Sequence, residues 1–134
     1  MKKNIFIFIF LISSITGFAQ FKKASFMING YALQYQVMFP ENYDATKQYP
    51  LVILLHGAGE RGNDNEKQLT YGKDFLLDSF TSQYPAIVIV PQCPADSYWA
   101  NVMRHEIDGK MTLTFGISDS PTLAMQSLMG LVQN

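Results

Sequence analysis

Residues 51–62 read LVILLHGAGERG, an uninterrupted apolar run that passes directly into a glycine-rich turn. The run 51–55 shows no polar alternation, which is typical of a strand buried on both faces of a mostly parallel sheet. Gly57, Gly59 and Gly62 allow the backbone that follows to turn sharply and to aim amide groups into a cavity. Acyl transfer through a tetrahedral intermediate requires such fixed donors where negative charge develops on the carbonyl oxygen. The stretch therefore predicts a strand whose carboxyl end can stabilise an oxyanion.

The residues after this stretch are predicted to complete a strand-helix-strand crossover. Residues 66–80 place leucines and phenylalanines near helical spacing, with an interruption or a late start near Gly72. Residues 86–90 repeat the buried-strand pattern, and Pro91 is expected to end that strand. Two buried strands joined by a helix become parallel neighbours in one sheet. The pattern predicts the α/β class.

Two antiparallel hairpins are expected on either side of this crossover. Alternating apolar and polar residues from Phe26 to Phe39 surround Asn29-Gly30, which is the strongest short-range indication of a hairpin because both residues tolerate positive φ. A second, shorter hairpin is expected around Asp108-Gly109, with residues 111–115 as its second strand. The first hairpin should open the domain.

Several of these features together resemble a known family. His56-Gly57, the continuation 58–62, the Pro-Gln-Cys-Pro sequence at 91–94 and Trp99 resemble the α/β-hydrolase fold, in its exported carboxylesterase and prolyl-oligopeptidase-like branch. The resemblance runs from about Leu33 to the end of the chain. It implies a partial α/β-hydrolase fold, with an antiparallel hairpin leading into parallel strands with crossover helices, truncated before the nucleophile elbow. It also implies a serine hydrolase acting on small-molecule carboxylic esters, or on peptide bonds, without a cofactor.

The resemblance assigns roles to the residues of the turn. It makes the backbone amides of Gly57 and Ala58 the oxyanion-hole donors, with Ala58 the first donor and its side chain uninvolved. It places the catalytic histidine far downstream, so His56 is expected to position the loop, which includes Gly59, by a side-chain hydrogen bond. The alternative is that the glycines only make a tight turn between a strand and a helix.

Further side chains near the turn each have two interpretations. Glu60 and Arg61 either order the loop through a local ion pair or are solvated charges, and exposed pairs contribute at most about 1 kcal/mol. Trp99, together with Pro94 and Tyr98, either lines the rim of an acyl or alcohol pocket or packs in the core. The sequence leaves both questions open.

The sequence contains no match to Gly-x-Ser-x-Gly, the motif that a nucleophile elbow requires between a strand and a helix. The nearest approach, 116–120, offers Ser118 but lacks the last glycine, and capping explains it better, with Ser120 as the N-cap of a helix that begins at Pro121. The fold orders its triad as serine, acid and histidine, yet no histidine follows His105. We therefore expect no catalytic residue here, an inactive chain, and a truncated gene, a partial gene model or a fragment. Such a chain should expose apolar surface at an open sheet edge.

Charge, histidine and cysteine content disfavour several classes of function. The chain carries 10 basic and 11 acidic side chains with no block of like charge, so a nucleic acid partner is not expected. The only histidines, His56 and His105, are not at ligand spacing, and no metal site is expected. Cys93 is the single cysteine, so it cannot form an internal disulfide and is expected to be a small buried apolar residue.

Residues 1–19 have the features of a signal peptide. Lys2 and Lys3 precede a short apolar run, and small residues lead to Ala19, after which cleavage is expected. A membrane anchor is the alternative, but a bilayer requires about 20 predominantly apolar residues. A lipoprotein would require a cysteine at the cleavage site. We expect a periplasmic or secreted protein with no stable membrane span, in which residues 20–134 are the N-terminal part of an α/β-hydrolase domain.

A function of a different class fits the same residues. In a non-catalytic exported binding module, the glycine loop would be only a turn, and the aromatic-rich strands from Phe26 to Phe39 would present a surface to a carbohydrate or a peptide. The sequence carries no sign of an oligomeric state. The substrate of an esterase would also stay undetermined, because few pocket residues can be named.

Overall fold

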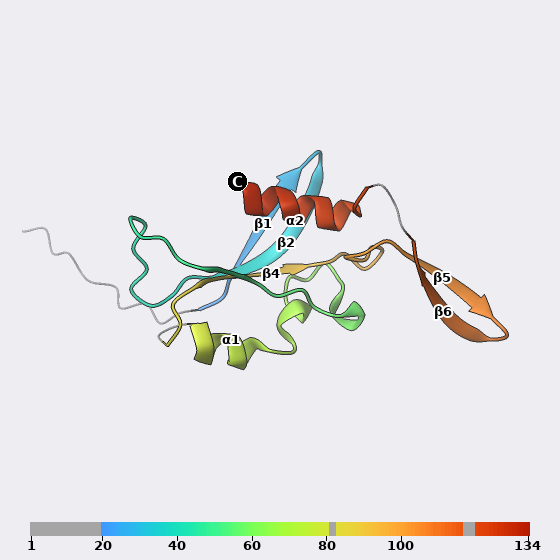
Figure 1. Ribbon diagram of the computed structural model, residues 1–134, viewed down its shortest axis with the longest axis horizontal. Coiled ribbons are helices and arrows are strands. Elements are labelled where there is room, and N and C mark those ends of the chain that lie inside the picture. Colours follow the sequence, from blue (N-terminus) through green and yellow to red (C-terminus); the bar gives the residue numbers. More distant parts are fainter. Residues whose placement is uncertain (1–19, 81–82, 117–119) are drawn as a thin grey trace, which may run out of the picture.

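The computed structural model describes residues 20–80, 83–116 and 120–134, which form a mixed α/β arrangement (Figure 1). One sheet has the strand order β1-β2-β4-β3, with β1 (Lys22–Ile28), β2 (Tyr31–Met38), β4 (Ile87–Gln92) and β3 (Leu51–Ile53). Between β3 and β4 lie two 3₁₀ turns, η1 (Ala58–Glu60) and η2 (Lys67–Leu69), and helix α1 (Lys73–Phe80). A hairpin of β5 (Val102–Ile107) and β6 (Lys110–Phe115) and helix α2 (Leu123–Gln133) follow.

The first hairpin forms as predicted. β1 and β2 pair antiparallel, with Ile28 opposite Tyr31, and the two residues between them have φ angles of 50° at Asn29 and 79° at Gly30. Positive φ at both central residues gives the turn the twist that the flanking strands require. The hairpin therefore sets the register of β2, which in turn pairs antiparallel with β4.

The strand-helix-strand crossover is also present. β3 and β4 are parallel neighbours, and the Leu54 amide extends their pairing by donating to the Ile89 carbonyl at 3.0 Å. The predicted interruption of the helix is found at Gly72, where φ is 84°, and the Gly72 carbonyl accepts from the Leu76 amide in the first turn of α1. The glycine thus separates η2 from α1.

Pro91 does not end its strand, contrary to the prediction. β4 continues to Gln92, and Pro91 lies opposite Tyr35 of β2. The carbonyl of Ile89 faces β3, and a residue two positions later faces the same side of the strand. The last paired residues of β3 and β4 are Ile53 and Ile89, so the missing N–H of Pro91 costs no hydrogen bond between the two strands.

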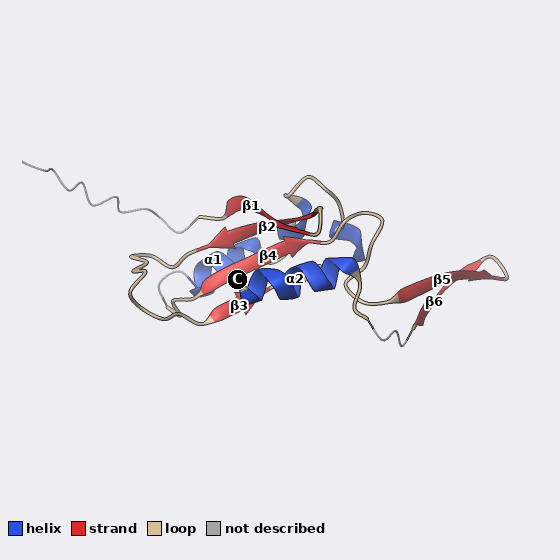
Figure 2. Cartoon of the chain, turned by 90° about the horizontal axis from the view of Figure 1, so that it is seen from above, coloured by secondary structure: helices blue, strands red, loops and turns tan. Residues whose placement is uncertain are grey.

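The helices cover the two faces of the sheet. α2 contacts β1 and β2, α1 contacts β4, and the two helices lie on opposite sides of the sheet (Figures 1 and 2). Side chains from β2, η2, α1 and β4 build the core on the α1 side, with the buried members Phe21, Met38, Leu69, Leu76, Val88 and Val90. On the other face Gly130 of α2 approaches Phe26 and Ile28 so closely that a Cβ there would lie 3.1–3.2 Å from their side chains. Glycine at this position lets the helix pack close to the sheet.

The prediction that residues 51–55 are buried on both faces is wrong. Leu51, Ile53 and Leu55 are 44%, 37% and 41% exposed. β3 is the last strand of the sheet, α2 packs on β1 and β2, and Val52 and Leu54 are the side chains of this run that pack against the core. The expected apolar surface at an open sheet edge is therefore confirmed. Such an edge presents unpaired backbone groups beside apolar side chains.

Helix α2 begins later than predicted. Its N-cap is Thr122, whose hydroxyl oxygen accepts from the Met125 amide at 3.2 Å, so Ser120 is not the cap and Pro121 is not the first helical residue. The Thr122 hydroxyl also donates to the Trp99 carbonyl, a long-range contact that fixes where the helix starts. Ser118 lies outside the described residues. Within the described ranges, no helix is long and apolar enough to cross a membrane.

The second hairpin is confirmed and stands away from the sheet. β5 and β6 pair antiparallel around Asp108 and Gly109, whose φ angles are 53° and 71°. The hairpin projects beyond one end of the molecule (Figures 1 and 2), and every residue of β6 is exposed. It contributes little to the core, and the sheet with its two helices carries the site described below.

Core burial predicts a large difference between two leucine truncations. Leu33 on β2 is fully buried, whereas Leu113 on the projecting hairpin is about half exposed. Leu33→Ala is expected to lower the free energy of unfolding by about 2–5 kcal/mol through lost burial and a residual cavity. Leu113→Ala should change it by no more than about 0.5 kcal/mol. Urea denaturation followed by circular dichroism measures both, and equal losses would contradict the described core.

Candidate functional site

The turn after β3 contains backbone amides, among them those of Gly57, Ala58 and Gly59, that have no acceptor among the described residues. The chain runs extended through Gly57, at φ −75° and ψ −179°, and then enters η1 at Ala58. Among the described residues, neither the Ala58 amide nor the Gly59 amide donates a hydrogen bond. The first amides of a helical turn have no acceptor within it, so both are free to bind a ligand or water. Both residues are exposed.

His56 orients the peptide group that carries the Ala58 amide. Its Nε2 accepts from the Cys93 amide at 2.9 Å, which puts the proton of the neutral ring on Nδ1, where it is donated to the Gly57 carbonyl at 2.7 Å. The Gly57 carbonyl and the Ala58 amide belong to one planar trans peptide and point in opposite directions. Fixing the carbonyl against the ring therefore directs the amide away from it.

Arg61 fixes the next peptide group in the same way. Its Nε donates to the Ala58 carbonyl at 2.9 Å, and that carbonyl shares a peptide plane with the Gly59 amide. Of the two interpretations left open by the sequence, the ion pair between Glu60 and Arg61 is not found, and the Arg61 guanidinium donates to backbone carbonyls instead. Arg61 thus contacts the loop through the loop backbone and not through Glu60.

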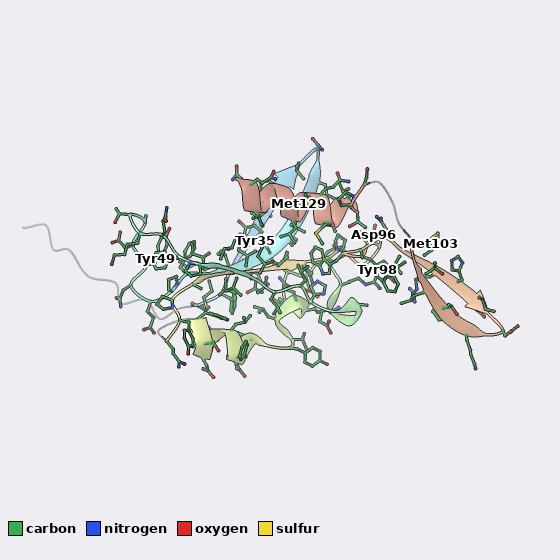
Figure 3. The ribbon with its side chains drawn as sticks, in the orientation of Figure 1. Tyr35, Tyr49, Asp96, Tyr98, Met103 and Met129 are labelled. Carbon is green, nitrogen blue, oxygen red and sulfur yellow. The ribbon has the colours of Figure 1, made fainter. Side chains whose placement is uncertain are left out.

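The same guanidinium ties the turn to the segment after β4. Nη1 of Arg61 donates to the carbonyls of Ala95 and Ser97 at 3.1 and 2.9 Å. The guanidinium carbon also lies 4.0 Å above the centre of the Tyr98 ring, a cation–π contact. Tyr98 lies between the sheet and the β5–β6 hairpin (Figure 3). Arg61 thus connects the turn to the segment after β4 through two backbone carbonyls and the Tyr98 ring.

A small cavity borders the turn. It has a volume of about 200 Å³ and is lined by Leu54, Leu55, His56, Gly57, Glu60, Gln68 and Tyr71. Trp99 is not among these residues, and instead its ring stands edge-on to the His56 ring at a centroid distance of 5.5 Å. A role for Trp99 or Pro94 in a substrate pocket therefore stays a prediction.

A buried polar network, which we did not predict from the sequence, underlies the loop that follows the turn. Asn65 adopts a positive φ of 54°, and its side-chain amide donates to the carbonyls of Ala24 and Tyr35 at 3.2 and 3.1 Å. The backbone carbonyl of Asn65 accepts from the Gln36 side chain at 2.7 Å. Asparagine tolerates positive φ and offers both donors and an acceptor, so a buried Asn in a loop was the one local indication available.

Asp64, Cys93 and Tyr31 have shifted pKa values. Hydrogen bonds from the Lys67 amide, the Gln92 side chain and the Glu66 amide hold the pKa of Asp64 well below its usual range. Burial raises the pKa of Cys93 to about 11, and the residue is a buried thiol, as the sequence predicts. Burial, with the nearby Cys93 and Asp96 adding smaller effects, raises the pKa of Tyr31 to about 12.

The other histidine is remote from the turn. His105 is an exposed residue of β5, opposite Thr112 on the projecting hairpin. Across the residues that the structure describes, no three His, Cys, Asp or Glu side chains gather closely enough to hold a metal ion. The candidate site is accordingly made of backbone amides, with His56 and Arg61 as its supports.

Comparison with known proteins finds a similar solved structure. No family model and no curated protein matches the chain. A crystal structure of a thermostable esterase matches it with a TM-score of 0.53 and 33% sequence identity, over 60% of this chain and 23% of the esterase chain. The chain thus has a hydrolase-like mixed α/β fold, similar to part of an esterase, and spans less than a quarter of that protein.

The low pKa of Asp64 predicts an acid-sensitive loop. A carboxylate whose pKa is lower in the folded than in the unfolded chain stabilises the fold above its unfolded pKa of about 3.9, and that stabilisation disappears as the pH falls further. The free energy of unfolding should therefore fall more steeply below about pH 4 for the wild type than for Asp64→Asn. Urea titrations at neutral and acidic pH measure this slope. Asp78→Asn on exposed α1 is the control and should follow the wild type, and a wild-type slope in Asp64→Asn would contradict the assignment.

Proposed function

We propose that this chain contributes the oxyanion-hole segment of a serine-hydrolase-type carboxylic ester hydrolase that acts on small-molecule esters. The observation that carries the proposal is the unbonded Ala58 amide at the carboxyl end of a parallel strand, directed by His56. The similarity to a thermostable esterase supports the same reaction class. Peptide-bond hydrolysis by a prolyl-oligopeptidase-like relative is the neighbouring possibility, and no described contact favours it.

The proposed role is electrostatic. When a nucleophile attacks an ester carbonyl, the carbonyl oxygen becomes an anion, and donors that are already in place stabilise it without reorganisation. The Ala58 amide is the principal donor, and the Gly57 amide, in the same extended stretch, is the second candidate from the sequence. The Ala58 side chain takes no part. The Arg61 contact to the Ala58 carbonyl keeps η1 from rotating during the reaction.

The nucleophile and its base are proposed to come from outside the described residues. His56 has one ring nitrogen bonded to the Cys93 amide and the other to the Gly57 carbonyl, so it has no position left for a serine hydroxyl. His105 stands on the projecting hairpin. A serine without a base is a weak nucleophile, and we therefore propose that the chain alone is inactive. Export by residues 1–19, which lie outside the described ranges, also stays a proposal.

The rival function as a binding module receives less support from the packing. Phe26 and Ile28 of β1 lie against Gly130 of α2, and Leu33 of β2 is fully buried. The helix thus packs against Phe26, one of the aromatic side chains that such a module would present. No described contact on this face singles out a carbohydrate or peptide ligand.

The proposal is tested by removing one N–H group. In a hybrid in which this chain replaces the matching segment of the thermostable esterase, Ala58→Pro is expected to lower kcat for p-nitrophenyl acetate about 10²–10³-fold, with KM little changed. Proline suits this position, because Ala58 is the first residue of η1 and Gly57 before it is extended. The substitution therefore deletes the donor with little strain.

Ala58→Gly is the matched control, because it keeps the amide and should retain kcat within a few-fold. Full activity in the Ala58→Pro hybrid would refute the proposed oxyanion donor. A separate experiment treats the purified chain by itself with a fluorophosphonate probe and maps adducts by mass spectrometry. We expect no labelled serine, and labelling of Ser118 would show that a nucleophile had been overlooked.

A further inference from the structure

Gln92 is a buried polar side chain at the end of an otherwise apolar strand. It is the last residue of β4, is only 1% exposed, and follows four buried residues of that strand. An amide removed from water costs free energy unless its donor and acceptor groups both find partners. Its hydrogen bonds therefore indicate what the residue does.

Both ends of the Gln92 amide bind the segment that follows the oxyanion turn. Its Oε1 accepts from the Asn65 amide at 2.7 Å. Its Nε2 donates to Oδ1 of Asp64 at 2.8 Å and to the carbonyl of Glu60 at 3.3 Å. Glu60 is the last residue of η1, the turn that begins with Ala58. One side chain thus joins the end of the turn to the loop beyond it.

The backbone of the next residue holds the two ends of the same turn. The Cys93 amide donates to His56 before the turn, and the Cys93 carbonyl accepts from the Gly62 amide after it at 2.9 Å. Gly62 sits so close that a Cβ there would lie 3.2 Å from Nε2 of Gln92. A larger residue would push against the amide that it lies beside, which explains the glycine at this position.

We propose that Gln92 is a positioning residue for the oxyanion turn, which it holds in place through Glu60 and Asp64 while the Cys93 backbone holds the turn's two ends. The inference rests on the proposed function for its catalytic meaning. It adds a residue on β4 that lies beneath the turn and touches no substrate. Its effect is to keep the Ala58 and Gly59 amides in one orientation.

The test is a measurement of local order in the full chain. Backbone ¹⁵N relaxation should give order parameters near about 0.85 for Ala58 and Gly59 in the wild type, the range of rigid backbone. Gln92→Met keeps the length of the side chain but removes all three hydrogen bonds, and these values should fall below about 0.6. Gln126→Met, on the exposed face of α2, is the matched control and should leave them unchanged.

Gln92→Glu distinguishes the hydrogen bond that the side chain accepts from the two that it donates. It also replaces Gln92→Met as the test variant if Gln92→Met does not fold. The carboxylate still accepts from the Asn65 amide but no longer donates to Glu60, and it repels Asp64. We expect Ala58 and Gly59 to lose order while Asn65 stays ordered. Order parameters at wild-type values for Ala58 and Gly59 would overturn the proposal, as would a loss spread equally over α1 and α2, which would indicate a general stabilising role.

The outcome does not depend on esterase activity. A loosened turn in the Gln92 variants, combined with full activity of the Ala58→Pro hybrid, would keep the positioning role and refute the proposed function. An unchanged turn in the Gln92 variants, combined with loss of activity in the Ala58→Pro hybrid, would keep the proposed oxyanion donor and refute the positioning role of Gln92. In the hybrid, adding Gln92→Met to Ala58→Pro should cost no further kcat if Gln92 acts only through that amide, whereas an independent role gives an additive loss.

Discussion

The hydrogen bond from the Cys93 amide to the His56 ring joins the end of β4 to the turn after β3, and the candidate site depends on it. Pairing between these parallel strands ends at Ile53 and Ile89, with one further bond from Leu54, so the chain beyond needs other supports. The ring supplies one, because its acceptor at Nε2 fixes the tautomer and places a donor on the Gly57 carbonyl. A rigid peptide plane then transmits that constraint to the Ala58 amide.

Two polar side chains complete the support: Arg61 acts on backbone carbonyls, and Gln92 acts on two backbone groups and the Asp64 carboxylate. Arg61 binds three carbonyls from two segments, and Gln92 binds one amide, one carbonyl and one carboxylate. Contacts of this kind fix geometry more firmly than an exposed ion pair, because a planar fork or amide defines direction as well as distance. Preorganised donors are what stabilisation of a developing oxyanion requires.

Local patterns predicted the elements of this fold but not the contacts between them. The structures of Asn29-Gly30 and of the two apolar runs depend mainly on residues close in sequence. The hairpin and the parallel pair of strands that they predict are both found. The start of α2 was missed because Ser120-Pro121 is a good local cap signature, whereas Thr122 is selected by its distant contact to Trp99. The exposure of β3 could not be predicted either, since periodicity does not reveal a strand's place in the sheet.

The same distinction between local patterns and distant contacts decides which roles of the site residues could be predicted. The position of the turn was predicted from the glycines after an apolar run, and the choice of Ala58 from the family resemblance. The partners of Arg61 and Gln92 lie 27 to 36 residues away in most cases, and such pairings leave no mark in a single sequence. The sequence analysis places Gln92 only in the Pro-Gln-Cys-Pro sequence after the predicted strand, so neither its place in β4 nor its burial is predicted.

Amide hydrogen exchange measured residue by residue on the folded chain tests the central claim most directly. The account predicts that the Ala58 and Gly59 amides exchange with almost no protection, while the amides of Leu54 and Gly62, which donate to Ile89 and Cys93, are protected. Strong protection of the Ala58 amide would show that an ordinary main-chain acceptor occupies it. The turn would then have no donor to offer an oxyanion.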